Sequence, residues 1–442
     1  MADDRPPRSE PEGLAARRAA LELLQAAARR RGGMDEALTA PGFDGLDGRD
    51  RGFARALAMA ALRRRGPIDR ALQAKLNRVP PDEVMDLLRI GAAQLQAMDV
   101  PAHAAISTTV ELAARSRTAR PFKGLVNAVL RGLQREPPAN LGPEALAPDW
   151  LYARWRSAYG EEAAAAMAAL IAEEPAADLT PRDPADAASL AQELDAELLA
   201  GGSLRTRRHG DVSEWPGFAE GRWWVQDASS AVPARLLAPR PGETILDLCA
   251  APGGKALQLA AAGAKVTAVD RSAGRLRRLS ENLARIGLAA EVVVADAGAW
   301  DDGRVFDAVL LDAPCTATGT FRRHPDVLWA TRPGDISKLA ALQAQLLAAS
   351  ADRVRPGGRL VYCVCSLEPE EGEAQVRGFL QARPDFLIGP AAAGEGGAPA
   401  QSVGAEGWLR ILPHHLAGGT DGFFAARLER LPGLAGDVTS EA

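Results

Sequence analysis

The sequence predicts a multidomain protein in which an all-α domain is followed by a small α+β domain and a Rossmann-like α/β domain. Three observations predict this order. Apolar residues recur at helical spacing over 13–133, a Pro-rich stretch follows over 136–148, and short apolar strands alternate with helices after Glu243. With 442 residues, 47% of them hydrophobic and 25% charged, the chain exceeds one hydrophobic core and has an ordinary globular composition.

The same patterns give the expected domain limits. We expect the all-α domain over residues 1–136, a linker over 137–148 and the small α+β domain over 149–221. The α/β domain then covers 222–432, and 433–442 form a tail. Within the middle domain the spacing predicts helices over 161–172 and 186–199, followed by a basic stretch over 205–209.

Five short apolar runs in the α/β domain are interpreted as buried strands, namely 244–248, 265–269, 291–294, 306–311 and 359–363. Helices such as 275–286 lie between them. Continuous apolar strands separated by helices are typical of a parallel doubly wound sheet. Near the end of the chain, 409–412 and 423–428 predict a hairpin with Asp421 and Gly422 as its turn.

The net charge of −5 is distributed unevenly. Residues 1–136 contain 23 Lys and Arg against 17 Asp and Glu, whereas the remainder contains 29 against 40. The N-terminal domain is therefore the expected docking surface for a polyanion, because phosphate neutralisation supplies most sequence-independent affinity. Alternatively, Arg-rich stretches such as 29–31 and 63–65 are solvated helix faces.

The first ten residues, the apolar runs and the cysteines indicate the cellular compartment in which the protein is expected. Residues 1–10 are charged and contain Pro, and the longest apolar run, 163–172, is too short to span a bilayer. We expect a soluble cytoplasmic protein with no membrane partner. Four cysteines are too few to stabilise so long a chain by disulfide bonds, and their spacing is unlike that of a zinc site. Free thiols and no bound metal are expected.

A glycine-rich loop follows strand 244–248, at the place where open α/β sheets bind ligands. Gly253 and Gly254 permit close approach of a ligand to the backbone. Asp270 ends the second strand, where its carboxylate can accept hydrogen bonds from the two hydroxyls of a ribose. Asp296 follows the third strand, where its carboxylate can reach the edge of an adenine ring. The dinucleotide and triphosphate glycine motifs are absent from the sequence. A tight structural turn is the alternative interpretation.

Four motifs carry a resemblance to a known family. They are DLCAAPGGK at 247–255, DAPCTATGT at 312–320, RRHPDVLW at 322–329 and YCVCSLEPEE at 362–371. Together they closely resemble the bacterial ribosomal RNA small-subunit cytosine-C5 methyltransferase B family, within the NOL/NOP/Sun group. The stretches VPAHAAI at 100–106 and KGLVNAVLR at 123–131 resemble the NusB-like RNA-binding domain of that family.

The resemblance implies a NusB-like domain, a class I methyltransferase domain and S-adenosylmethionine as cofactor. It implies Cys365 as the nucleophile and Cys315 as a second, product-releasing cysteine. The family usually has Thr before the nucleophile, whereas this chain has Val364, which strand alternation turns away from Cys365. The residues implied to surround the cofactor are Cys249, Ala250, Ala251, Pro252, Gly253, Gly254, Lys255, Asp270, Arg275, Asp296 and Asp312.

The chemistry implied by the resemblance requires a covalent cysteine, because C5 of cytosine becomes nucleophilic only after a thiolate has added to C6. Lys255 is the candidate positive charge beside Cys365, and Asp312 offers a carboxylate to the N3 and N4 edge of the base. The base must be single-stranded or flipped out. Candidates for stacking on it are Trp223, Trp224 and Trp329, and a buried core position is the alternative for the first two.

The expected partner is RNA, namely small-subunit ribosomal RNA or a pre-ribosomal particle. A DNA cytosine methyltransferase would instead use Cys315, but it needs neither Cys365 nor a NusB-like domain. A non-catalytic assembly factor would not need Asp312 and both cysteines together. Cys363, inside its strand, is interpreted as structural. The candidate phosphate contacts are Arg115, Arg117, Arg120, Lys123 and Arg131.

Overall fold

The structure is a computed structural model that describes residues 13–29, 33–136 and 141–432. It contains two compact units. Residues up to Glu173, together with the segment Arg323–Thr331, form the first unit, and Glu174–Arg322 with the chain from Arg332 onward forms the second. The predicted tail, the first ten residues and part of the predicted linker lie outside the described residues.

The first unit is all-helical, as the apolar spacing predicts. Leu14, Leu24 and Leu62 are fully buried in its core. Each helix contributes to this core with the apolar face that it turns inward. The helices α9 and α10 belong to this unit, although the sequence placed 149–172 in the middle domain. The helices are α1 (Leu14–Arg29), α2 (Gly33–Ala37), α3 (Pro41–Asp44), α4 (Gly48–Arg63), α5 (Arg65–Gln73), α6 (Asp82–Gln96), α7 (Ala102–Arg115), α8 (Lys123–Arg135), α9 (Asp149–Tyr159), α10 (Glu161–Ala169) and α15 (Val327–Ala330).

The second unit begins with a small antiparallel sheet of strand order β2-β3-β1-β4. Its strands are β1 (Ala177–Pro181), β2 (Ala196–Leu198), β3 (Leu204–Thr206) and β4 (Trp223–Val225). The predicted helix over 186–199 is wrong in its second half: α11 covers only Ala187–Glu193, and β2 follows. Asp195 has a φ of 48°, a left-handed conformation that does not continue a helix.

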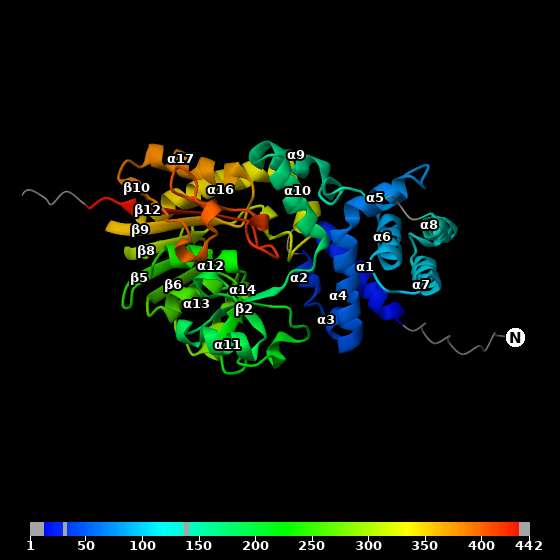
Figure 1. The fold of residues 1–442 in the computed structure, drawn as a ribbon, viewed down its shortest axis with the longest axis horizontal. Coiled ribbons are helices and arrows are strands. Elements are labelled where there is room, and N and C mark those ends of the chain that lie inside the picture. The colour runs from blue at the N-terminus through cyan, green and yellow to red at the C-terminus, as the bar shows by residue number, and fades with distance from the viewer. Residues whose placement is uncertain (1–12, 30–32, 137–140, 433–442) are drawn as a thin grey trace, which may run out of the picture. The chain divides into compact units, whose positions relative to one another are not determined.

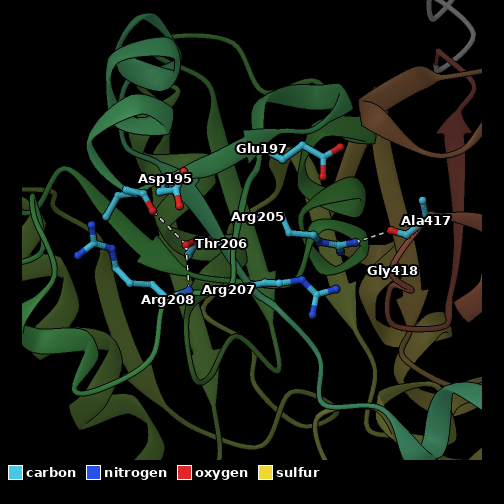
Figure 2. Close-up of a pocket in the computed structure, with 9 residues that line it drawn as sticks. Asp195, Glu197, Arg205, Thr206, Arg207, Arg208, Ala417 and Gly418 are labelled. Carbon is cyan, nitrogen blue, oxygen red and sulfur yellow. Dashed lines mark hydrogen bonds between the residues drawn. The ribbon is translucent and has the colours of Figure 1, made fainter.

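A pocket beside this small sheet is lined by residues 205–208 of the predicted basic stretch 205–209 (Figure 2). Arg205 is bound to the buried Asp178 by two hydrogen bonds and also donates to the carbonyl of Ala417 at 2.9 Å. Figure 2 shows the side chains of Arg207 and Arg208 extending in opposite directions. Because acidic side chains also line the pocket and Arg205 is already paired, the basic residues do not form one continuous phosphate-binding surface. The pocket residues are Leu194, Asp195, Glu197, Arg205, Thr206, Arg207, Arg208, Ala417 and Gly418.

The large sheet of the second unit has the strand order β10-β12-β9-β8-β5-β6-β7, with β11 paired to β12. The five strands from β9 to β7 are parallel, as predicted, whereas β10, β11 and β12 add an antiparallel edge. The predicted all-parallel sheet is thus corrected to a mixed one. The strands are β5 (Thr244–Leu248), β6 (Lys265–Asp270), β7 (Glu291–Val294), β8 (Phe306–Asp312), β9 (Val354–Val364), β10 (Phe386–Gly389), β11 (Leu409–Ile411) and β12 (Phe423–Arg430).

Helices cover both faces of this sheet (Figure 1). One face packs against α12 (Ala228–Leu236), α13 (Gly254–Ala261) and α14 (Ala273–Ile286), and the other against α16 (Pro333–Asp352) and α17 (Glu373–Ala382). Since the carboxyl ends of parallel strands meet at one edge, the loops after β5, β6, β8 and β9 are brought together there.

The predicted hairpin forms, but not with the predicted turn. In the register of β11 and β12, Ile411 lies opposite Phe423, so residues 412–422 connect the strands. Asp421 is buried, and its backbone N–H donates to the carboxylate of Asp227 at 3.2 Å. The N–H of Gly422 donates to the carbonyl of Gly319. These residues are therefore held by distant partners rather than by a tight turn.

Candidate active site

Two cysteines from neighbouring strands meet at the carboxyl edge of the large sheet. The Sγ atoms of Cys315 and Cys365 lie 3.5 Å apart, close enough for one thiol to donate to the other. The hydrogen bond to Cys365, with burial as the second cause, raises the pKa of Cys315 well above its ordinary value. Cys315 is therefore a thiol that holds its proton more strongly than a free cysteine does.

The side chain before the nucleophile candidate points the other way, as predicted. Val364 is fully buried in the core on the α16 face, whereas Cys365 packs against the core on the α13 face. The replacement of the usual Thr by Val364 thus does not alter the face that carries Cys365.

An ion pair lies beside the cysteines. Lys255, at the start of α13, donates to Asp312 at the end of β8, with 2.7 Å between Nζ and Oδ2. Burial alone would lower the pKa of Lys255, but the charge of Asp312 and the nearby thiols of Cys363 and Cys365 raise it above its ordinary value. Lys255 is therefore a permanent positive charge that interacts with Cys365.

Cys363, interpreted from the sequence as structural, contacts the same ion pair. Its Sγ is 3.5 Å from Oδ1 of Asp312 and donates to it. Burial, as the largest cause, raises the pKa of Cys363 well above its ordinary value, so it keeps the proton that it donates. The available signal was strand alternation, because Cys363 and Cys365 are two residues apart and share a face.

The glycine-rich loop after β5 is held by two predicted residues. The buried carboxylate of Asp270 accepts a hydrogen bond from the N–H of Ala251 at 3.2 Å, and Arg275 donates to the carbonyl of Ala251. Gly253 has a φ of 112°, and a Cβ there would lie 2.3 Å from Cδ1 of Leu279. Cys249 has its pKa raised to about 12, mainly by burial. The loop thus presents backbone rather than reactive side chains.

Sequence reasoning gave no individual role to Asp247, the first residue of the motif 247–255. Asp247 in β5 is fully buried, and neither of its carboxylate oxygens has a hydrogen-bond partner among the described residues. Burial raises its pKa well above the ordinary value. A buried carboxylate without a partner is costly unless a ligand completes it. The signal available in the sequence was an acidic residue inside the apolar strand TILDL.

Asp296, the third predicted cofactor contact, lies just after β7. Its side chain is exposed, and Oδ1 accepts a hydrogen bond from the N–H of Gly298 at 2.8 Å. The structure therefore places it on the loop that follows the third strand, with the carboxylate partly turned back to its own backbone.

The three predicted stacking tryptophans are held by other residues of the protein. Trp223 and Trp224 are buried and donate through Nε1 to Pro216 O and Gln226 Oε1, which agrees with the core interpretation. Trp329 lies in the first unit, where its Nε1 donates to Leu62 O and the guanidinium of Arg65 covers its ring at 4.8 Å. Its indole N–H and one ring face are therefore already occupied.

The predicted phosphate contacts in the first unit are all exposed: Arg115, Arg117, Arg120, Lys123 and Arg131. Of the arginines in the alternative interpretation, Arg29 and Arg64 are exposed, as it expected, whereas Arg63 and Arg65 are not. Arg63 is buried and donates to the carbonyl of Ile171, and Arg65 packs on Trp329.

Comparison with known proteins decides the family. Residues 234–429 match the model of the 16S rRNA methyltransferase RsmB/F family, and residues 14–135 match the NusB family. The chain is 40% identical to the ribosomal RNA small subunit methyltransferase B of Sodalis glossinidius, over 77% of this chain and 80% of that protein. The chain belongs to the RsmB/F methyltransferase family. The corresponding protein of Xanthomonas campestris is 40% identical over 86% of this chain and 90% of its own length.

Solved structures agree with this RsmB/F assignment. The crystal structure of PH0851 superposes with a TM-score of 0.78 at 25% identity and covers 95% of this chain and 99% of its own. A methyltransferase homologue from Pyrococcus horikoshii gives a TM-score of 0.54 at 27% identity, over 64% of this chain.

Family membership makes the chain an S-adenosylmethionine-dependent methyltransferase with a NusB-like domain, as the sequence predicted. In the part of the chain that the structure describes, no helix has the length and apolar character needed to cross a membrane.

Proposed function

We propose that this RsmB/F protein methylates C5 of a cytosine in small-subunit ribosomal RNA through a covalent bond between Cys365 and C6. The observation that carries the proposal is the pair of thiols 3.5 Å apart beside the Lys255–Asp312 ion pair. A thiolate nucleophile needs nearby positive charge, and a second group must handle the proton that leaves C5.

The residues of the glycine-rich loop fit the cofactor. Asp247 offers two unpartnered carboxylate oxygens that suit an ammonium group, and Asp270 at the end of β6 suits ribose hydroxyls. The backbone of Cys249, Ala250, Pro252 and Gly254 lies along the same loop, and Arg275 holds it from α14. When bound, S-adenosylmethionine supplies an electrophilic methyl group on a sulfonium.

Cys365 begins the reaction on the base. Its thiolate adds to C6, so that an S–C6 bond forms and the electron pair of the C5–C6 bond moves toward C5. Lys255 stabilises the thiolate by its positive charge. Asp312 offers a carboxylate that accepts from the amino group at N4 and from a protonated N3, which polarises the base toward addition at C6. C5 then takes the methyl group.

Cys315 completes the reaction. The C5 proton must leave and the S–C6 bond must break before the product is free. A thiol with a raised pKa gives a strongly basic thiolate once its proton is lost. Cys315 therefore passes its proton to the departing sulfur of Cys365, 3.5 Å away, and takes the proton of C5. The proton that left C5 is then on Cys315, and the proton now on Cys365 is released to solvent, so Cys365 is again a thiolate and Cys315 again a thiol.

The substrate follows from the relatives and from the first unit. Two relatives at 40% identity carry the name of ribosomal RNA small subunit methyltransferase B. The NusB-like unit offers exposed cationic side chains to RNA phosphates. We propose small-subunit ribosomal RNA, free or in a pre-ribosomal particle, as partner, which locates the reaction in the bacterial cytoplasm.

The proposal is tested by bisulfite sequencing of ribosomal RNA from a strain that lacks the gene. One small-subunit cytosine should lose its methylation and regain it when the wild-type gene is restored, but not with Cys365→Ala. Unchanged methylation of every small-subunit cytosine in the deletion strain would contradict the proposed substrate.

A further inference from the structure

A buried carboxylate lies next to the residues that follow both cysteines. Glu371 ends the short 3-10 helix Pro369–Glu371 and is fully buried. It is the last residue of the motif 362–371, and neither the resemblance nor the proposed reaction gives it a role. Its distance from Cys365 is only six residues along the chain, so it belongs to the loop after β9.

The two carboxylate oxygens of Glu371 accept four hydrogen bonds. Oε1 accepts from the N–H of Thr316 at 2.9 Å and from Nε2 of Gln343 at 3.0 Å. Oε2 accepts from the hydroxyls of Thr316 and Ser366. This buried acceptor is expensive to remove, because the N–H of Thr316 is then left unpaired and each of the other donors loses one of its partners.

These donors flank the cysteines. Thr316 follows Cys315, and Ser366 follows Cys365. Gln343 of α16 also donates to the carbonyl of Pro314 at 2.9 Å, so the peptide units on both sides of Cys315 are held. Since Gln343 donates to two acceptors, the orientation of its amide is fixed by its partners.

The cysteine loops are also joined by backbone. The N–H of Gly319 donates to the carbonyl of Cys365 at 3.0 Å, and the N–H of Ala313 donates to that of Cys363. These bonds hold the backbone where the strands and loops meet, and Arg410 also donates to the carbonyl of Ser366, but none of them involves the side chains of Thr316 and Ser366. The hydroxyls of Thr316 and Ser366 lie 3.0 Å apart, within hydrogen-bond distance of each other. Glu371 accepts from both hydroxyls and from the N–H of Thr316, so its carboxylate bridges the two loops beside this direct contact.

We propose that Glu371 is a positioning residue that sets the spacing of the Cys315 and Cys365 thiols through Thr316 and Ser366. The charge of Glu371 also helps to raise the pKa of Cys315, but its hydrogen bonds go to the residues that follow the cysteines. It therefore sets the spacing through the backbone that carries the thiols. The inference rests on the proposed function, because the spacing matters for catalysis only if both cysteines take part in the reaction. The spacing itself is measurable without RNA or cofactor.

The test measures how fast the full-length protein forms a Cys315–Cys365 disulfide under limiting diamide. The two thiols lose two electrons and two protons, which diamide takes up as it is reduced to a hydrazine. Peptide mapping by mass spectrometry identifies the linked pair. Disulfide formation demands a narrow range of sulfur and Cβ positions, so its rate reports the spacing directly.

Glu371→Ala removes all four bonds and should slow disulfide formation about 10- to 100-fold, the scale on which a displacement of about 1 Å affects a reaction. Glu371→Gln keeps an oxygen for Thr316 N–H and Gln343, so it should recover much of the rate. The matched control is Glu370→Gln, whose side chain is exposed, and it should stay within about 2-fold of wild type.

A folded Glu371→Ala protein that forms the disulfide at the wild-type rate would overturn the inference. If Glu371→Ala does not fold, Thr316→Val decides by the same criterion, because it removes one hydroxyl bond and keeps the Thr316 N–H. In methyl transfer, Glu371→Ala should lower kcat and leave the KM for cofactor unchanged, and Glu371→Gln should recover much of kcat. Rapid disulfide formation in a wild-type protein that methylates no RNA would refute the proposed function and leave this inference standing.

Discussion

Asp312 at the end of β8 lies opposite Cys363 in the parallel register with β9. This one pairing explains the active site, because Cys315 follows Asp312 by three residues and Cys365 follows Cys363 by two. The two loops leave the sheet at the same edge, and the thiols meet although they are 50 positions apart in the sequence.

The cofactor site is tested first by Asp270→Ala. We expect affinity for S-adenosylmethionine to fall by about 1.5–3 kcal/mol, the scale of a lost charge-assisted hydrogen bond. Isothermal calorimetry measures this, with Asp183→Ala, an exposed position in the second unit, as control. Unchanged affinity in Asp270→Ala would remove Asp270 from the site.

Asp247→Asn separates a binding role from a structural one. A buried carboxylate with no partner destabilises the fold, so the amide should leave the melting temperature unchanged or raise it. Affinity for the cofactor should nevertheless fall by about 10-fold or more, because a charged partner for an ammonium group is lost. A variant with lower stability and wild-type affinity would show that Asp247 serves the fold alone.

RNA binding by the NusB-like unit is tested in the full chain by the salt dependence of affinity. Affinity for a small-subunit RNA fragment should fall as salt rises, since phosphate contacts release counterions. Replacing Arg117 and Lys123, both exposed, by Ala should weaken binding and reduce the salt slope by about 1 for each cationic side chain removed. An affinity that does not change with salt would contradict phosphate docking.

Structural features that depend on residues close together in the chain could be predicted from the sequence. The five parallel strands, the glycine-rich loop and the cysteine positions at strand ends follow from apolar runs and motif spacing. The helix predicted over 186–199 was wrong because the conformation of Asp195 ends it early. The turn at Asp421 was wrong because its backbone bonds to Asp227, 194 residues away, which no local pattern reveals.

Interactions between distant residues were not predictable for the same reason. The bonds of Glu371 to Thr316 and of Cys363 to Asp312 join segments more than 50 residues apart. Trp329 was expected near the base, yet its segment packs into the first unit. Each of these depends on how chain segments meet in three dimensions.

The central claim is the division of labour between the two cysteines, and denaturing gels of Cys365→Ala and Cys315→Ala with substrate RNA and cofactor test it most directly. Cys365→Ala should form no covalent adduct and transfer no methyl group. Cys315→Ala should form the adduct and fail to release it, so that protein and RNA migrate together. A DNA-type assignment predicts instead that Cys315→Ala forms no adduct and that Cys365→Ala keeps nearly intact turnover. An adduct that persists in Cys365→Ala would contradict the role given to that residue.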